Sequence, residues 1–375
     1  MVFIIAISIT LAYLLLISVL IYGFVKVPKF KLDDAPPKTA FSIIVPFRNE
    51  ENNLPQLLKS IKDLDYPTDL FEIILIDDSS EDHSVKIIKT FIENGLKHVT
   101  ILKNKVKSTS PKKDAISKAI KNAKYDWVIT TDADCRVPKL WLKSFDSIIQ
   151  KSNLRLIAAP VNYYDIASFL DRFQTLDLLS LMGTTIGGFG IKEPFLANGA
   201  NLAYQKALFS ELSGFEGSTE IASGDDVFLL QKAVKYNSDD VYYLKSIDAT
   251  VETKPQRNWN QLVSQRLRWA AKSTSYKSFF AILTGIIVLL MNLLIIILIP
   301  IVSFGIFSLN NFIYIILVKF CVDFLLIFKT SRFLNQESVL PSFIVSSLFY
   351  PFFTMYIISI SFYKGYTWKG RTFKK

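Results

Sequence analysis

The sequence predicts an α/β protein in which a mainly parallel sheet is combined with transmembrane helices at both ends of the chain. Between residues 41 and 131, short apolar segments alternate with segments of helical periodicity. This alternation is typical of a parallel sheet covered on both faces. Three other segments are long and uncharged, as helices that cross a membrane require.

The uncharged segments are residues 1–25, 279–307 and 339–363. Each is longer than the ~20 helical residues that cross a hydrocarbon core. The first has neither the basic start nor the small-residue cleavage site of a signal peptide, so we expect an uncleaved anchor. We expect one C-terminal span at 279–301.

We expect another C-terminal span at residues 312–330, which is interrupted by Lys319 and Asp323. These two side chains lie four residues apart and can pair on one helix face. A structural ion pair is the favoured interpretation. A lipid or acceptor site is the alternative, because charges inside a membrane usually serve a function.

The chain of 375 residues has a formal net charge of +10, and its basic residues gather beside the apolar segments. This placement fits the positive-inside rule and attraction to anionic lipids. No zinc finger, RNA-binding signature or basic heptad region occurs, so we expect no nucleic-acid partner. The clustered residues are Lys26, Lys29, Lys31, Lys364, Lys369, Arg371, Lys374 and Lys375.

The predicted number of spans conflicts with this charge pattern. One N-terminal span and three C-terminal spans would place the basic tail outside, against the positive-inside rule. Either the segment 339–363 is re-entrant or interfacial, or the tail is an exception.

The two cysteines, Cys135 and Cys321, indicate no disulfide framework.

Predicted strands and predicted helices alternate between residues 41 and 131. Ligands of such sheets bind at the carboxyl ends of the strands, and polar side chains follow three of the predicted strands there. The predicted strands are 41–47, 71–77, 99–103 and 125–131, and the predicted helices are 52–63, 83–94 and 112–123. The polar residues are Arg48, Asn49, Glu50, Asp77, Asp78, Asp132 and Asp134.

The pattern changes after residue 154. Residues 256–278 combine Trp, Arg and Lys with apolar residues, which predicts an amphipathic helix at the membrane surface. The other predicted elements are a strand at 154–162, a helix at 168–182, a glycine-rich stretch at 183–203, a helix at 225–235 and an exposed strand or loop at 240–252.

Two acidic pairs at strand ends suggest a nucleotide and metal site. Asp132 and Asp134 flank one residue directly after an apolar strand, and such carboxylates can hold a hard divalent cation together with substrate phosphates. Asp77 and Asp78 end an earlier strand. Either could accept hydrogen bonds from a base or a ribose, or could cap the next helix.

A third acidic pair, Asp225 and Asp226, follows Gly224 and opens an apolar helix. One carboxylate could cap this helix, whereas the other could act as a general base beside an acceptor hydroxyl. Gln265, Arg268 and Trp269 then form a Gln-x-x-Arg-Trp pattern. The planar guanidinium of Arg can bind diphosphate oxygens, and the Trp ring offers a stacking face for a sugar. A surface helix at the membrane would explain the pattern equally well.

Together these motifs resemble the membrane-bound branch of glycosyltransferase family 2, which includes hyaluronan, cellulose, chitin and poly-N-acetylglucosamine synthases and ceramide-glucosyltransferase-like enzymes. The resemblance covers about residues 40–275. The matching stretches are VPFRNEENNLPQLLKSI, IDDSSEDHS, PKKDAISKAI, TTDADC, NGANLAYQKALFSELSGF, SGDDVFLL and QRLRW. Singly they are weak, but jointly they are specific.

The resemblance implies a GT-A fold, inverting sugar transfer, and Mg²⁺ or Mn²⁺ held by Asp132 and Asp134. Asp226 would be the catalytic base. The implied donor-binding residues are Pro46, Arg48, Glu50, Asp77, Asp78, Lys112, Lys113 and Asp132. The implied acceptor- or diphosphate-binding residues are Asp225, Gln265, Arg268 and Trp269.

The expected protein moves a sugar from a nucleotide sugar, with a uridine nucleotide favoured, to a lipid or glycan acceptor at the cytoplasmic face of the cell membrane. Such a reaction belongs to polysaccharide or glycolipid synthesis in the cell envelope. The alternatives are a processive polysaccharide synthase and an inactive nucleotide-binding membrane protein. The expected domains are an anchor at 1–25, a catalytic domain at 26–255, an interfacial helix at 256–278 and a membrane domain with its tail at 279–375.

Two features depart from the family pattern. Ser79 stands where many relatives have glycine, and the membrane part is smaller than in cellulose synthases. The small membrane part argues against a polysaccharide channel.

Overall fold

The computed structural model describes residues 1–273 and 275–373, so Lys374 and Lys375 lie outside the described residues. Contacts divide the chain into two compact units. The helical unit comprises Met1–Val27, Ile166–Phe195 and Pro255–Lys375. The sheet unit comprises Pro28–Asp165 and Leu196–Lys254.

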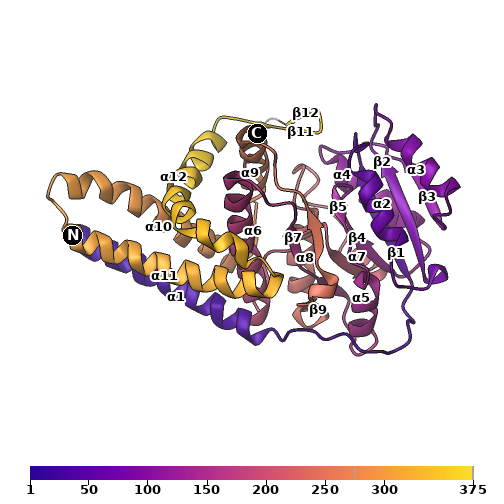
Figure 1. Ribbon diagram of the computed structural model, residues 1–375, viewed down its shortest axis with the longest axis horizontal. Helices are drawn as coiled ribbons and strands as arrows, with labels where there is room; N and C mark the ends of the chain where they lie inside the picture. The colour runs from indigo at the N-terminus through magenta and orange to yellow at the C-terminus, as the bar shows by residue number, and fades with distance from the viewer. Residues whose placement is uncertain (274, 374–375) are drawn as a thin grey trace. The chain divides into compact units, whose positions relative to one another are not determined.

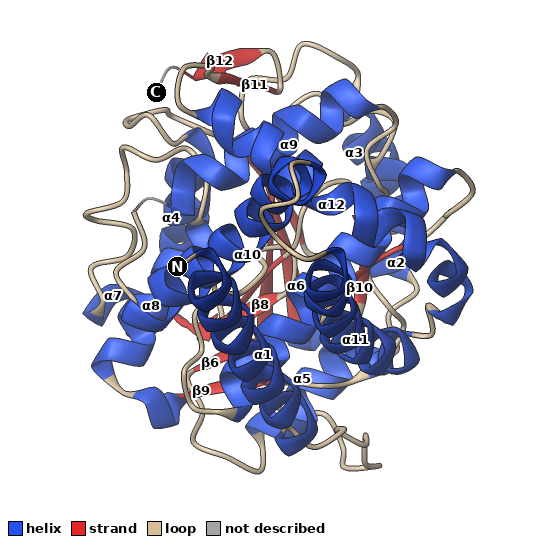
Figure 2. Ribbon diagram, turned by 90° about the vertical axis from the view of Figure 1, so that its left-hand side faces the viewer, coloured by secondary structure: helices blue, strands red, loops and turns tan. Residues whose placement is uncertain are grey.

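The sheet unit is built on a seven-stranded sheet with the strand order β3-β2-β1-β4-β8-β6-β9. Within the described residues, only β8 runs antiparallel to its neighbours, so the predicted mainly parallel sheet is confirmed. Figure 2 shows β8, β6 and β9 as neighbouring strands. The strands are β1 Phe41–Phe47, β2 Phe71–Asp77, β3 Val99–Lys103, β4 Trp127–Thr130, β6 Leu156–Ala158, β8 Leu202–Gln205 and β9 Val241–Tyr243.

The register brings the ends of three strands to one edge of this sheet. Phe47 at the end of β1 pairs with Asp77 at the end of β2, and Ile44 pairs with Thr130 at the end of β4. The chain runs outward from β1 to β3 and then returns to β4 on the other side of β1. The carboxyl ends of β1 and β4 therefore mark a topological switch point, where open α/β sheets bind ligands.

Helices cover both faces of the sheet. On one face, Ile43 and Val45 of β1 belong to a buried cluster that also contains Leu57 and Leu58. Ile44, which alternates with them and is equally buried, points to the opposite face. There α4 packs against β1 and β2. The helices of the unit are α2 Leu54–Lys62, α3 Ser84–Glu93, α4 Pro111–Asn122, α5 Trp141–Ile149, α7 Lys206–Glu211 and α8 Asp225–Tyr236, with short turns η1 Thr68–Leu70, η2 Ser238–Asp240 and η3 Ile247–Ala249.

The single strand predicted at 154–162 is wrong. The chain forms β6 and then β7, Val161–Tyr163, which belong to different sheets. Pro160 separates them, and proline cannot donate a ladder hydrogen bond. A three-stranded sheet unites β5 Cys135–Arg136, β10 Val251–Thr253 and β7. The prediction of an exposed segment at 240–252 is also wrong in part, because Tyr243 and Val251 are buried.

The helical unit contains the apolar segments. Among the described residues, four helical segments are long and apolar enough to cross a membrane. In Figure 1, α1 and α11 lie side by side along their lengths, and they contact each other. The elements are α1 Val2–Lys26, α6 Phe169–Gly190, α9 Trp259–Ser273, α10 Phe279–Ser303, α11 Leu309–Leu334, η4 Glu337–Ser342, α12 Phe343–Ser361, β11 Tyr366–Trp368 and β12 Arg371–Phe373.

Helix α6 is longer than predicted, because it continues from the expected helix through glycines of the glycine-rich stretch. A Cβ atom at Gly187 or Gly190 would collide with backbone atoms of α1 at Leu20 and Gly23. The glycines thus permit close packing of two helices, which outweighs their low helix propensity.

Polar contacts also join the helices of this unit. Lys319 and Asp323 pair on α11 as predicted, and the Tyr13 hydroxyl of α1 donates a hydrogen bond to Asp323. This arrangement fits a structural ion pair. After α12 the chain returns to α9, where Tyr366 of β11 packs against a cluster that contains Leu262 and Leu267.

Candidate active site

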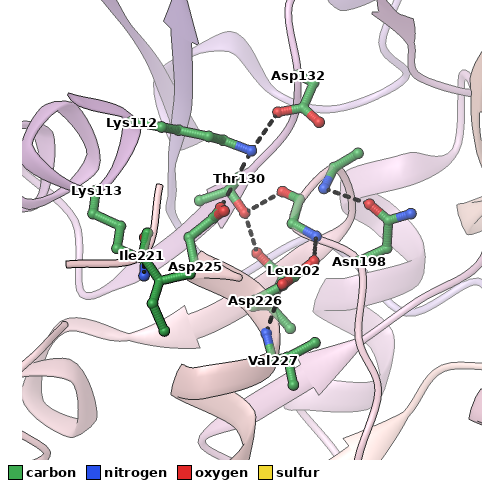
Figure 3. Close-up of polar contacts among 12 residues, drawn as sticks. Lys112, Lys113, Thr130, Asp132, Asn198, Leu202, Ile221, Asp225, Asp226 and Val227 are labelled. Carbon is green, nitrogen blue, oxygen red and sulfur yellow. Dashed lines mark hydrogen bonds and ion pairs between the residues drawn. The ribbon is translucent and has the colours of Figure 1, made fainter. Parts of the chain in front are cut away.

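A partly buried lysine joins the acidic residues that the sequence singles out. Lys112 lies at the start of α4, and its Nζ is 2.8 Å from Asp132 Oδ1 and 3.2 Å from Asp225 Oδ2 (Figure 3). Asp132 follows β4, whereas Asp225 opens α8. The fold therefore brings two acidic motifs, 93 residues apart in the sequence (225 − 132), around one cation.

The charges in this cluster stabilise one another. Burial alone would lower the pKa of Lys112, but the negative charges of Asp132, Asp225 and Asp226 outweigh burial and raise it. Burial alone would raise the pKa of Asp225, but Lys112 and Lys113 hold it below its ordinary value. Lys112 and Asp225 are therefore both charged near neutral pH.

Asp226 is held by two backbone donors. The Gly199 N–H donates to Oδ2 at 3.0 Å, and the Val227 N–H donates to Oδ1 at 2.7 Å. The carboxylate is fixed in orientation and remains partly exposed. A general base must be held within hydrogen-bond reach of the hydroxyl that it deprotonates, and the two N–H groups restrict this carboxylate in that way.

The segment 198–201 is a part of the site whose role the sequence did not indicate. Gly199 approaches the cluster so closely that a Cβ there would lie 2.8 Å from Asp225 Oδ2 and 3.6 Å from Lys112 Nζ. The Thr130 hydroxyl donates to the Gly199 carbonyl at 2.7 Å and so ties this loop to the end of β4 (Figure 3). The Asn-Gly dipeptide, typical of tight turns, was the available signal.

We expect Gly199→Ala to destabilise the sheet unit by about 1–3 kcal/mol, the usual cost of overpacking. The added methyl group must displace Asp225, so sugar transfer should fall as well. Thermal unfolding in detergent measures the first effect. Gly285→Ala is the control, because a Cβ at Gly285 meets no atom within 4 Å. Equal unfolding temperatures for the two variants would contradict the close contact.

The residues after β1 and β2 form a second cluster. Asp77 Oδ1 accepts from the Ser80 N–H at 2.8 Å, which stabilises the turn after β2. Arg48 donates to the carbonyls of Asp78 and Ser79 at 2.8 and 2.6 Å. Ser79 has φ +62°, the left-handed region that favours glycine, which fits the glycine that the family resemblance implies at this position.

Asp78 is buried and is oriented by a residue that the sequence analysis did not single out. The Asn104 amide donates to Asp78 Oδ1 at 2.8 Å and to the Pro111 carbonyl at 3.0 Å. Asn104 thus links the end of β2 to the start of α4, one residue before Lys112. A polar residue directly after the predicted strand 99–103 was the signal in the sequence.

The other predicted donor-binding residues lie nearby in the chain. Pro46 is the penultimate residue of β1, and buried Glu50 accepts a hydrogen bond from the Asn53 amide at 2.7 Å. Lys113 differs from Lys112, because its Nζ donates to the carbonyls of Ser218 and Ile221 at 2.6 and 2.9 Å. Lys113 therefore positions the loop before α8, whereas Lys112 is the lysine in the acidic cluster.

The donor set suits a hard divalent cation. Asp132 is partly exposed and already faces the ammonium group of Lys112, and Asp134 is exposed two residues further on. Among the described residues, no group of three His, Cys, Asp or Glu side chains could hold a metal by itself. Mg²⁺ is often bound by one or two carboxylates together with substrate phosphates, so two aspartates suffice.

Gln265, Arg268 and Trp269 lie on α9 in the helical unit, and all three are partly exposed. Arg266 and Leu267 between them are buried. The roles of all these residues in donor and acceptor binding stay predictions.

Comparison with a solved structure identifies the fold of this chain. A mannosyltransferase from Pyrobaculum calidifontis, PcManGT, solved in complex with GDP-Man and Mn²⁺, superimposes with a TM-score of 0.57 at 17% identity. The match covers 93% of this chain and 99% of that one. The sheet unit has the GT-A fold, as the resemblance implied.

Residues 42–212 match the family model described as glycosyl transferase family 2. A probable glycosyltransferase of Bacillus subtilis, YdaM, is 24% identical over 61% of this chain and 54% of its own length. The poly-β-1,6-N-acetyl-D-glucosamine synthase of Staphylococcus epidermidis is 30% identical over 38% of this chain and 33% of its own length. The chain thus spans between a third and about half of these two curated relatives.

Proposed function

We propose that this protein transfers a sugar from a nucleotide-sugar donor, with a uridine nucleotide favoured, to a lipid or glycan acceptor, with inversion at the anomeric carbon. The observation that carries the proposal is the cluster of Asp132, Asp225 and Asp226 around Lys112 at the switch point of the sheet. The family match of residues 42–212 and the sugar-polymer synthesis of a relative support the same reaction.

The proposed reaction is a single displacement. Asp226 accepts the proton of the acceptor hydroxyl, because its carboxylate is oriented by two N–H groups and is partly exposed. Lys112 supplies positive charge where the diphosphate leaves. Asp132 and Asp134 would hold Mg²⁺ or Mn²⁺, whose Lewis acidity helps the diphosphate to depart.

Donor binding is assigned to the cluster after β1 and β2. We assign Asp78, which Asn104 orients, as an acceptor of a hydrogen bond from the base or the ribose. Arg48, Asp77 and Glu50 support the loops around it. Gln265, Arg268 and Trp269 are assigned to the diphosphate and the acceptor on the strength of the Gln-x-x-Arg-Trp pattern.

We also propose that the sheet unit and the C-terminal tail face the cytoplasm. Helix α9 precedes α10, and β11 after α12 packs against α9, so both lie on one side of the membrane. An even number of crossings must therefore separate them. Helix α12, which contains Pro351 and packs against α9 near its C-terminal end, is then the helix that does not cross. This topology obeys the positive-inside rule.

A screen of labelled UDP- and GDP-sugars against membranes that contain the protein, with Mn²⁺ present, tests the function. We expect one donor to be consumed and its sugar to appear on a lipid or an oligosaccharide, identified by mass. A long polymer made by the purified protein would favour the processive alternative. If no donor is consumed, the inactive nucleotide-binding protein becomes the better description.

Loss of either metal-binding carboxylate should weaken cation binding. We expect Asp132→Asn and Asp134→Asn each to reduce Mn²⁺ affinity in the presence of UDP by at least about tenfold, since each removes a charged ligand. Electron paramagnetic resonance of free Mn²⁺ measures this affinity. Asp65→Asn, at an exposed aspartate of the same unit, is the control. Unchanged affinity in both site variants would argue against this metal site.

A further inference from the structure

The Gln265–Trp269 segment has a buried half and a partly exposed half. Arg266 is only 8% exposed and Leu267 only 3%, whereas the residues that define the motif remain accessible to substrate. The Gln-x-x-Arg-Trp pattern specifies no residue type at position 266. The burial of an arginine there needs a physical reason, because a buried charge is costly unless it is paired.

The partner of Arg266 is Asp177 on α6. Arg266 Nε lies 2.9 Å and Nη2 lies 2.6 Å from Asp177 Oδ2, and both side chains are almost fully buried. Tyr350 of α12 lies close to both residues. The guanidinium thus donates one hydrogen bond through Nε and makes an ionic contact through Nη2 with the same carboxylate oxygen, a combination that a lysine could not reproduce.

Helix α6 holds α9 at a second point. Gln174, one turn before Asp177, donates to the Gln256 carbonyl at 3.0 Å and accepts from the Gln256 N–H at 2.8 Å. Phe173 beside it packs against Trp259, with ring centroids 5.7 Å apart. The start of α9 and its middle are thus fixed to the same stretch of α6.

Arg266 in turn contacts two residues of the motif. Its Nη1 donates to Gln265 Oε1, and its guanidinium lies over the Trp269 ring, 4.2 Å from the centroid. One side chain thereby fixes the amide of Gln265 and one face of Trp269. The orientation of Arg266 itself depends on Asp177.

We propose that Asp177 and Arg266 are positioning residues for acceptor and diphosphate binding, and that they act through Gln265 and Trp269. This inference rests on the proposed function, in which those two residues contact substrate. Asp177 is far from the motif in sequence and belongs to none of the stretches that carry the family resemblance. Its place is defined only by the packing of α6 against α9.

Asp177→Asn tests the proposal, because it removes the charge and keeps the size of the side chain. We expect kcat/KM for sugar transfer from UDP-N-acetylglucosamine, or from the donor that the screen identifies, to fall about 10- to 100-fold, the usual effect of misplaced substrate-binding groups. UDP affinity should fall by a smaller factor, because the base and the ribose are assigned to the sheet unit and only the diphosphate contacts depend on Gln265 and Trp269. Arg266→Lys, which keeps the charge but loses the fork, should give a smaller loss of the same kind.

A double-mutant cycle separates positioning from general destabilisation. If Asp177 acts through Gln265, then Gln265→Ala should cost much less in the Asp177→Asn background than in the wild type. Additive losses would overturn the proposal. Glu337→Gln is the matched control, since it removes an ion pair with Arg332 that is well exposed in the same unit.

A second measurement needs no active donor. The fluorescence of Trp269, obtained as the difference between chains with and without Trp269→Phe, should be quenched more readily by acrylamide when Asp177 is asparagine. Unchanged quenching would overturn the proposal even if no sugar were transferred. Failure of the wild type to transfer any sugar, with the expected quenching, would instead count against the proposed function alone.

Discussion

Asp226→Asn should nearly abolish sugar transfer while leaving nucleotide binding intact. Loss of a general base typically lowers the rate by ~10²–10⁴-fold. UDP should still bind, because Asp78, Asn104 and Lys112 are unchanged. The measurements are kcat with a labelled donor and UDP affinity by calorimetry, both on the full chain in detergent.

The hydrogen bond from the Gly199 N–H to Asp226 complicates this test, because asparagine keeps only one oxygen acceptor. Thr130→Val is therefore the matched control. It removes the hydroxyl that holds the same loop at the Gly199 carbonyl but leaves the Asp226 carboxylate in place. One neutral hydrogen bond is worth ~1 kcal/mol, so activity should fall less than about tenfold. Similar losses in both variants would indicate a structural role for Asp226.

Lys112→Met should have the largest effect on stability. It leaves Asp132 and Asp225 close together without the cation between them. Breaking a buried ion pair by removing one partner costs about 3–5 kcal/mol, and partial exposure of Asp132 favours the lower end of that range. Denaturant unfolding of the full chain measures the free energy of unfolding. Lys121→Met, at an exposed lysine of the same helix, is the control.

The loss of stability in Lys112→Met should depend on pH, which gives a second test of the ion pair. In the wild type, Lys112 and Lys113 keep the pKa of Asp225 below its ordinary value, so the stability that Asp225 contributes is lost as the pH falls through that lowered pKa. Without Lys112, burial should raise the pKa of Asp225. The difference in stability between variant and wild type should therefore shrink as the pH falls towards about 4. A difference that stays constant with pH would contradict the ion-pair account.

Strands and helices of the first half of the sheet unit could be predicted closely. The strands at 41–47, 71–77 and 99–103 have the predicted bounds, and three helices begin and end within two residues of theirs. Apolar periodicity decides such elements locally. The prediction of one strand at 154–162 is wrong, because Pro160 separates β6 from β7. Helices α5 and α7 were not predicted.

The glycine-rich stretch shows that a local sequence pattern does not predict how closely two helices pack. Its composition predicts irregular structure, yet Gly187 and Gly190 lie inside α6 because α1 packs too closely for a side chain. The same helix carries Asp177. No local pattern marks an aspartate that will pair with an arginine 89 residues later (266 − 177).

The sequence by itself determined the α/β class, the membrane-compatible helices and the acidic motifs, because strand periodicity, hydrophobic length and motif spacing are local properties. Only the tertiary structure decided which groups meet. It selected Lys112 rather than Lys113 as the cation of the acidic cluster, and it revealed Gly199, Asn104 and the Asp177–Arg266 pair. The physical reason is that ion pairs and close backbone contacts depend on distances across the fold, which residue type and spacing do not specify.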